Sequence, residues 1–223
     1  MAILAFFCKT SLNDLKNLES IKLANEKVFA LSVLPLNELL GFGVHEGSKI
    51  LLAGEPGCGK STLLLQLVKD FQIFNSVLYF SLEENLSGVK KRAERLGVKN
   101  KNLLLSVSYD LSIMTKEIEN ANPDIIIIDS LQMIISEQGS VKTMKNALSI
   151  FLEKFPSKTV FIISHINKEG KIAGSKFIEH MVDVVLMMEN VTKTKKRVHS
   201  IKNRFSSLCS SPNLLLTNKG FEA

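Results

Sequence analysis

Short apolar runs alternate with amphipathic stretches along most of the chain. This pattern is typical of a mostly parallel β-sheet covered by helices. The runs that predict strands are 50–53, 77–81, 103–107, 125–129 and 160–164. The stretches that predict helices lie at about 62–71, 85–96 and 141–155. We therefore expect an α/β fold.

Two features refine this arrangement. The run 125–129 is the most β-branched in the chain, so we expect it at the centre of the sheet. After residue 182 the pattern predicts antiparallel strands at 183–188, 196–201 and 214–217. Residues 1–30 have weaker periodicity. We divide the chain into a lead-in segment, 1–30, and one folded domain, 31–223.

Composition narrows the class of protein. The chain has 223 residues, of which 45% are hydrophobic and 22% charged, which suits one medium domain and excludes a disordered chain. No apolar run reaches the ~18 residues of a membrane span, and the first residues lack the basic leader of a signal peptide. We expect a cytoplasmic protein without a membrane segment. The three cysteines form no C-x-x-C pair, so neither disulfides nor zinc are expected.

One motif carries specific chemistry. The residues Gly54, Glu55, Pro56, Gly57, Cys58, Gly59, Lys60 and Ser61, followed by Thr62, match G-x-x-x-x-G-K-[ST] between a predicted strand and a predicted helix. Glycines let the backbone wrap phosphates, Lys60 would reach the β- and γ-phosphates, and Ser61 would ligate Mg²⁺. A glycine-rich turn matching by chance is disfavoured by the flanking elements. ATP is preferred over GTP because 218–221 lacks the aspartate of an Asn-Lys-x-Asp stretch.

Acidic residues follow two predicted strands. Asp129 ends the run 125–129, where it would hold Mg²⁺ directly or through water, although it could instead cap a helix. Glu83 and Glu84 follow the strand 77–81, whose end we expect beside the P-loop strand. A carboxylate there, Glu83 by preference, would align water for attack on the γ-phosphate. The alternative is a solvated face of the next helix.

Further polar residues lie near the C-terminal strands. His165 follows the strand 160–164, where it would sense the γ-phosphate or serve as a structural group. The glycine-rich, basic loop 167–176 after it favours the sensor. Lys202 and Arg204 could be a solvated strand face or supply cations to a neighbouring subunit's nucleotide. A formal net charge of +6 weakly favours an anionic partner.

These motifs together resemble the ATPase core of the bacterial RadA (also called Sms) DNA-repair proteins. The resemblance extends from about residue 31 to residue 221. The segments that carry it are 54–66, 79–84, 92–96, 129–132, 165–174, 179–183 and 202–205. The last three are more specific than the P-loop, which alone indicates only an NTPase.

The resemblance implies a RecA-like P-loop NTPase fold that assembles as a homo-oligomer, a hexameric ring. It implies binding of single-stranded DNA, ATP hydrolysis and branch migration beside RecA recombinase. Lys60, Ser61 and Asp129 would bind ATP and Mg²⁺, and Glu83 would be the catalytic glutamate. Lys202 and Arg204 would engage DNA and act in hydrolysis across the subunit interface.

The chain departs from the RadA family in several places. It contains no four-cysteine zinc finger and no Lon-protease-like domain. Ser175 stands where the family usually has proline, Ser206 stands where it has glycine, and the loop 132–139 is shorter. Two alternatives therefore stay open. One is a replicative-helicase-like ATPase, and the other is a KaiC-like nucleotide-switched regulator without DNA coupling.

Overall fold

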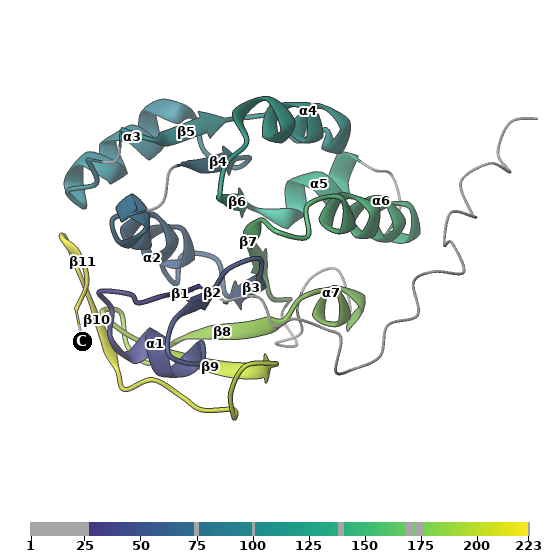
Figure 1. The fold of residues 1–223 in the computed structure, drawn as a ribbon. Coiled ribbons are helices and arrows are strands. Elements are labelled where there is room, and N and C mark those ends of the chain that lie inside the picture. The colour runs from purple at the N-terminus through teal and green to yellow at the C-terminus, as the bar shows by residue number, and fades with distance from the viewer. Residues whose placement is uncertain are drawn as a thin grey trace, which may run out of the picture.

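The computed structural model describes residues 27–73, 76–99, 101–137, 141–167, 172 and 176–222. A twisted sheet runs through the middle of the domain, and helices cover both of its faces (Figure 1). The elements in chain order are β1 (Val28–Phe29), α1 (Pro35–Leu39), β2 (Val44–His45), β3 (Lys49–Gly54), α2 (Lys60–Leu67), a 3₁₀ helix (Asp70–Ile73), β4 (Val77–Ser81), α3 (Leu86–Arg95), β5 (Leu103–Ser106), α4 (Leu111–Ala121), β6 (Ile125–Asp129), α5 (Leu131–Glu137), α6 (Val141–Lys154), β7 (Thr159–His165), α7 (Lys176–Met181), β8 (Val184–Asn190), β9 (Lys195–Asn203), β10 (Leu214–Thr217) and β11 (Gly220–Glu222).

The strand order of the main sheet is β11-β10-β9-β8-β3-β7-β6-β4-β5. The strands from β8 to β5 pair in parallel, and β8 with β9, β9 with β10 and β10 with β11 pair antiparallel. The predicted mostly parallel sheet with antiparallel C-terminal strands is therefore confirmed. β8 is a mixed case, because it pairs in parallel with β3 on its other side.

Two expectations about position in the sheet are wrong. The centre is β3, not β6, because β-branched content reports burial on both faces, and β3 is equally buried. The end of β4 does not lie beside β3, because β6 and β7 fill the two places between them. The connection from β3 through α2 to β4 therefore passes the positions of β7 and β6. The local sequence pattern does not predict this strand order.

Alternating side chains of the strands build a separate core on each face. On β3, the side chains of Ile50 and Leu52 belong to the core formed with α1, α2 and α3. Those of Leu51 and Ala53 belong to the core formed with α4, α5, α6 and α7. In Figure 1, α2 and α3 lie on the left of the sheet, and α4, α5 and α6 lie on the right. Because both faces are covered, the polar groups of the parallel strands meet solvent mainly at the strand ends.

The start of the described chain belongs to this fold. Val28 and Phe29, which fall inside the lead-in segment 1–30, pair antiparallel with β2. The rest of that segment, 1–26, lies outside the described residues. No helix in the described part of the chain combines the length and the apolar character needed to cross a bilayer.

Candidate nucleotide-binding site

The P-loop connects the central strand to a helix. β3 ends at Gly54, and α2 begins at Lys60, two residues before the predicted start. Gly57 and Gly59 have φ angles of +75° and +107°, in the region that favours glycine. A Cβ at Gly59 would lie 2.8 Å from the ring of Phe221, whereas one at Gly57 would meet open space. The loop is therefore packed on one side and open on the other, as a phosphate cradle requires.

Lys60 is buried at the base of this loop. Its Nζ donates to the carbonyl oxygens of Gly54 (2.9 Å) and Glu55 (2.8 Å), and it lies 3.8 Å from Sγ of Cys58. Burial lowers the pKa of Lys60, and the nearby Cys58 and Asp129 oppose that shift. Burial also raises the pKa of the Cys58 thiol. The ammonium is thus held inside the loop, where a bound phosphate would meet it.

Asp129 lies at the end of β6, close to the P-loop helix. The hydroxyl of Tyr79 donates to its Oδ2 at 2.5 Å. Burial raises the pKa of Asp129, while hydrogen bonds from Tyr79 and Ser61 lower it. A carboxylate and a serine hydroxyl side by side are oxygen ligands of the kind that Mg²⁺ prefers. Ser61 and Asp129 therefore fit a magnesium ion, as the sequence predicts.

Two neighbouring glutamates have different surroundings. Glu83 accepts a hydrogen bond from Ser130, and its Oε1 lies 3.5 Å from Nε2 of His165. Glu84 instead pairs with Arg92 of α3, with 2.8 Å between Oε2 and Nη2. The Leu82 amide donates to the Asp129 carbonyl at 2.7 Å, which continues the parallel pairing of β4 with β6 one residue past Ser81. Glu83 follows directly and lines the same cavity as the P-loop, despite the two intervening strands.

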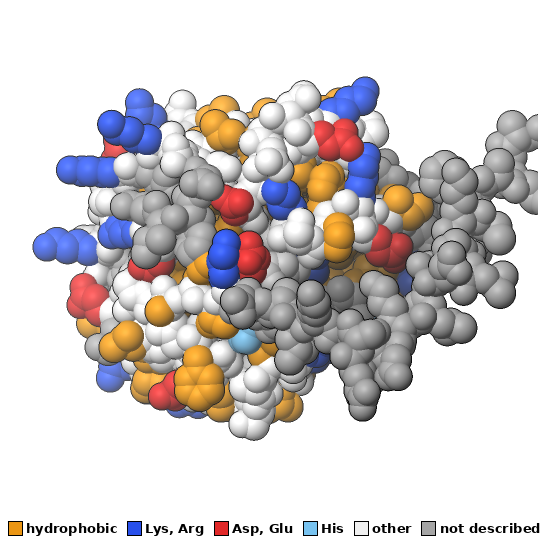
Figure 2. Space-filling model, in the orientation of Figure 1, with side chains coloured by type: hydrophobic (Ala, Val, Ile, Leu, Met, Phe, Trp, Pro, Cys, Tyr) orange, Lys and Arg blue, Asp and Glu red, His pale blue; other side chains and the backbone are white. Residues whose placement is uncertain are grey.

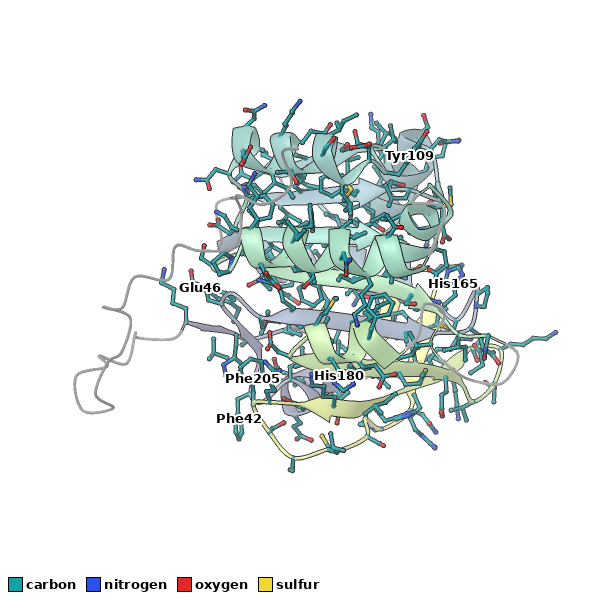
Figure 3. The ribbon with its side chains drawn as sticks, turned by 90° about the vertical axis from the view of Figure 1, so that its right-hand side faces the viewer. Phe42, Glu46, Tyr109, His165, His180 and Phe205 are labelled. Carbon is teal, nitrogen blue, oxygen red and sulfur yellow. The ribbon has the colours of Figure 1, made fainter. Side chains whose placement is uncertain are left out.

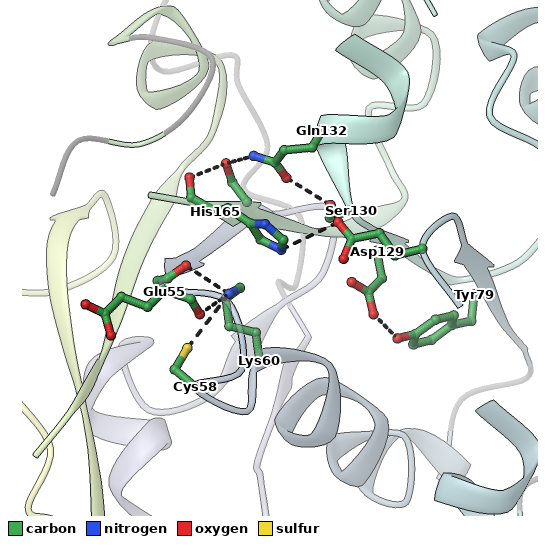
Figure 4. Close-up of polar contacts among 11 residues, drawn as sticks. Glu55, Cys58, Lys60, Tyr79, Asp129, Ser130, Gln132 and His165 are labelled. Atoms are coloured by element: carbon green, nitrogen blue, oxygen red, sulfur yellow. Dashed lines mark hydrogen bonds and ion pairs between the residues drawn. The ribbon is translucent and has the colours of Figure 1, made fainter. Parts of the chain in front are cut away.

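A cavity of about 300 Å³ joins these groups (Figure 4). It is lined by Pro56, Gly57, Gly59, Lys60, Ser61, Thr62, Glu83, Arg92, His165 and Leu216. The structure therefore brings together Lys60, Ser61, Thr62, Glu83 and His165 around one pocket, with Asp129 hydrogen-bonded at its edge.

Sequence reasoning missed several residues of this region: Tyr79, Arg92, Ser130, Gln132 and Leu216. Tyr79 carried a usable signal, since a tyrosine in an otherwise apolar strand needs a hydrogen-bond partner. Arg92 had a weaker signal, as one of several cations on an amphipathic helix. Leu216 reaches the pocket from the C-terminal hairpin, and no local pattern predicts that long-range contact.

Lys202 and Arg204 lie at the other end of the sheet. The register pairs Lys202 with Val185 and Asn203 with Val184, whereas Gly54 of the P-loop pairs with Met188. Figure 3 shows the adjacent Phe205 at the opposite end of the strands from His165. Among the described residues, neither Lys202 nor Arg204 lines the pocket of its own chain.

The contacts of these two cations differ. Nζ of Lys202 donates to the carbonyls of Glu179 (2.7 Å) and Val182 (2.6 Å) at the end of α7. Burial and the nearby Arg204 lower the pKa of Lys202. Nη1 of Arg204 lies 3.1 Å from Oδ1 of Asp183, but 59% of its side chain is exposed. Arg204 is therefore accessible to a neighbouring molecule, while Lys202 helps to hold α7 in place.

On one face of the molecule, the described positive side chains are not gathered in a single patch (Figure 2). On the face in Figure 2, Lys and Arg side chains project mainly along the rim, with Asp and Glu side chains between them. Exposed cations of α3 (Lys90, Lys91 and Arg95) lie near the pocket-lining Arg92.

Comparisons with known proteins agree with this geometry. A family profile described as an AAA domain matches residues 26–171. The DNA repair protein RadA of Bacillus subtilis is 38% identical over 197 residues, which is 84% of this chain and 43% of that protein. RadA of Aquifex aeolicus is 40% identical over 195 residues, covering 84% of this chain and 44% of that protein. The chain thus spans less than half the length of these relatives.

A solved structure is similar to the whole fold. A KaiC-like protein from Pyrococcus horikoshii superposes with a TM-score of 0.72 at 18% sequence identity, over 88% of this chain and 98% of that one. This likeness supports the RecA-like fold, and the relatives confirm the predicted resemblance to RadA. Since the AAA profile covers more than half of its residues, the chain belongs to the AAA domain family, with a RecA-like core similar to that of the RadA proteins.

Proposed function

We propose that this chain binds ATP with Mg²⁺ and hydrolyses it as a DNA-dependent motor of the RadA type, acting in recombinational repair. The observation that carries the proposal is the convergence of Lys60, Ser61, Asp129 and Glu83 from the ends of β3, β4 and β6 on one cavity. The identity to proteins named for DNA repair supports the biological role.

Each residue of the site has a role in this proposal. Lys60 and the amides of residues 57–61 hold the β- and γ-phosphates. Ser61 and Asp129 hold Mg²⁺, which neutralises charge between the phosphates. Glu83 orients the attacking water, and His165 contacts the γ-phosphate from the end of β7. The carboxylate of Glu83 is exposed and lies 3.5 Å from His165, which supports these two roles.

The same proposal extends to assembly and partners. Arg204 acts on the nucleotide of a neighbouring copy in a homo-oligomeric, hexameric ring, because it is exposed and far from its own pocket. Lys202 supports that surface through α7. Single-stranded DNA binds to the ring through Lys and Arg side chains, with an affinity that falls with salt. RecA recombinase is the proposed partner in branch migration.

The test is steady-state ATP hydrolysis by the purified chain, with and without single-stranded DNA, at several salt concentrations. Lys60→Ala is the blank, and Lys116→Ala, on α4 away from the P-loop, is the matched control. We expect salt-sensitive stimulation by DNA and loss of hydrolysis only in Lys60→Ala. Normal binding and turnover in Lys60→Ala would show that the site assignment is wrong.

A second outcome would favour a different function. The fold likeness to a KaiC-like protein supports a nucleotide-switched regulator as the alternative. Lys60-dependent hydrolysis that is indifferent to DNA at every salt concentration would reject the motor and favour this alternative.

A further inference from the structure

Behind the pocket, polar side chains form a chain of contacts that the proposed nucleotide chemistry does not use. Ser130 Oγ donates to Oε1 of Glu83 and lies 2.9 Å from Oε1 of Gln132. Nε2 of Gln132 in turn donates to Oγ of Ser164 at 3.0 Å. We call Glu83, Ser130, Gln132 and Ser164 the relay. Figure 4 shows it running from the end of β6 to the end of β7.

The relay closes on itself through His165. The Ser164 hydroxyl donates to the carbonyl of His165 at 3.3 Å, and Nε2 of His165 lies 3.5 Å from Oε1 of Glu83. The ends of three strands (β4, β6 and β7) are thereby connected by side chains as well as by the sheet. The carboxylate of Glu83 is restrained from the side of β6 and from the side of β7.

Two hydroxyl groups of the relay are fully buried. Ser130 and Ser164 are both 0% exposed. A buried hydroxyl is costly unless it is hydrogen-bonded, and hydrogen bonds in a buried network strengthen one another. Ser130 has one proton, so it donates to one oxygen at a time, and the two acceptors together restrict its rotamer. The side chain of Gln132 is held in turn by its donation to Ser164 of β7. The arrangement that restrains Glu83 therefore extends to the end of β7.

We propose that Ser130 and Gln132 are positioning residues that hold the Glu83 carboxylate for the attacking water and tie its orientation to the end of β7. This inference rests on the proposed function, in which Glu83 orients water. Among the described residues, neither Ser130 nor Gln132 lines the nucleotide pocket. Their loss should therefore affect the chemical step and leave nucleotide binding unchanged.

The test compares Ser130→Ala, Gln132→Leu and Ser164→Ala in steady-state ATP hydrolysis. We expect kcat to fall about 10-fold or more, while KM for ATP stays within about threefold of wild type. Gln132→Leu and Ser164→Ala break the same link, so the double variant should fall no further than the worse single variant. Ser130→Ala removes the donor to Glu83 without touching the pocket lining, so its effect should appear in kcat and not in KM.

The matched control is Ser149→Ala, on α6. Its hydroxyl donates to Oε1 of Glu153 at 2.7 Å on the exposed side of the helix. We expect its kcat and KM to equal those of wild type. If Ser164→Ala does not fold by circular dichroism, Gln132→Leu carries the test of this link alone, because it removes both the acceptor beside Ser130 and the donor to Ser164.

Two results would overturn the positioning role. One is an unchanged kcat in Ser130→Ala and Gln132→Leu, and the other is multiplicative losses in the double variant. In both cases Lys60-dependent hydrolysis by the wild type would remain, so the proposed function would survive. A wild type that hydrolyses no ATP would instead reject the proposed function and this inference together.

Discussion

Tyr79 is a fully buried aromatic residue whose hydroxyl meets a buried carboxylate. Its bond to Asp129 partly offsets the cost of burying that negative charge, because hydrogen bonds to a carboxylate lower its pKa. Burial and Asp129 raise the pKa of Tyr79 itself well above its usual value, so the phenol stays a donor across the physiological range. Asp129, the proposed magnesium ligand, is thus oriented by a residue from the neighbouring strand β4.

We predict that Tyr79→Phe weakens the binding of Mg²⁺ and leaves the P-loop intact. Asp129 loses a donor, its pKa rises further, and it is protonated over a wider range of acid pH. The Mg²⁺ concentration for half-maximal hydrolysis should rise about 10-fold, and the acid limb should shift upward. The measurement is the ATPase rate against Mg²⁺ and against pH. Tyr109→Phe, at the chain's other tyrosine, is the control, and identical curves for both variants would contradict the prediction.

Lys49 is a buried cation at the start of β3. Its Nζ donates to four carbonyl oxygens, those of Gly47, Phe155, Pro156 and Lys158, at 2.5–3.4 Å. Burial lowers the pKa of Lys49 to about 8, and Asp183 opposes this shift. The ammonium therefore holds the turn between α6 and β7 at a cost in desolvation.

This lowered pKa predicts a pH dependence of stability. Between pH 8 and pH 10.5 the unfolded chain holds the Lys49 proton more tightly than the folded chain does, so the free energy of unfolding rises with pH. Relative to Lys49→Met, the wild type should gain about 1 kcal/mol between pH 7 and pH 9. At pH 7 the substitution should itself cost about 1–3 kcal/mol, because it leaves carbonyls unpaired.

The measurement is urea unfolding of both proteins at pH 7, 8 and 9. Taking the difference between them cancels the titration of other groups, provided that those groups are distant from Lys49. A difference that stays constant with pH, or that shrinks as pH rises, would contradict the predicted sign.

At the scale of elements, hydrophobic periodicity predicted most strands closely. The bounds of β4, β6 and β10 agree with the expected runs, and β3 and β7 extend them by one or two residues. β3, β4, β6 and β7 are buried on both faces, so continuous apolar runs report them directly. The P-loop was also predictable, because its residues are contiguous and each has a physical role.

Other elements were not predicted. α4 carries buried Leu111, Met114 and Ile118 behind the N-cap Asp110, a helical spacing that the sequence does contain. α5 begins directly after β6, so its apolar residues merge with those of the strand. β11 depends on Gln66 of α2, which bonds both backbone groups of Phe221. Contacts between distant segments of this kind leave no local pattern.

The residues of the candidate site could be named from the sequence, but the strand order and the side-chain contacts that join them could not. Lys60, Ser61, Asp129, Glu83 and His165 all follow predicted strands, so topology brings them to one edge of the sheet. The strand order, however, was expected to place β4 beside β3, and the actual order, with β7 and β6 between them, is not visible in the sequence. Ser130 and Gln132 became meaningful only once their partners across β6 and β7 were known.

At the scale of the whole molecule, the pocket and Arg204 occupy opposite ends of one sheet. In the proposed ring, each chain would contribute one half of a nucleotide site at each end, the pocket at one and Arg204 at the other, as a heterologous contact allows. The two halves can be tested separately, because each is removed by one substitution.

We predict that two inactive variants complement each other when mixed. Lys60→Ala lacks the phosphate-binding cation, and Arg204→Ala lacks the cation for its neighbour. If the proposed contact forms, an equal mixture should recover roughly a quarter of the wild-type rate by random assembly. The measurement is hydrolysis at concentrations where the chains assemble. The control replaces Lys60→Ala by the double variant Lys60→Ala/Arg204→Ala, which should restore nothing. Normal hydrolysis by Arg204→Ala alone would contradict the idea.

The bonds that Lys60 makes to its own loop have a consequence for which nucleotide the site retains. The ammonium has three N–H groups and donates two of them to the carbonyls of Gly54 and Glu55, so phosphate oxygens that take more than one would compete with these carbonyls. A triphosphate brings more negative charge to that competition than a diphosphate does. When the γ-phosphate leaves, the balance moves back toward the carbonyls. In the proposed function, the backbone carbonyls of the loop would therefore favour retention of ATP over retention of ADP.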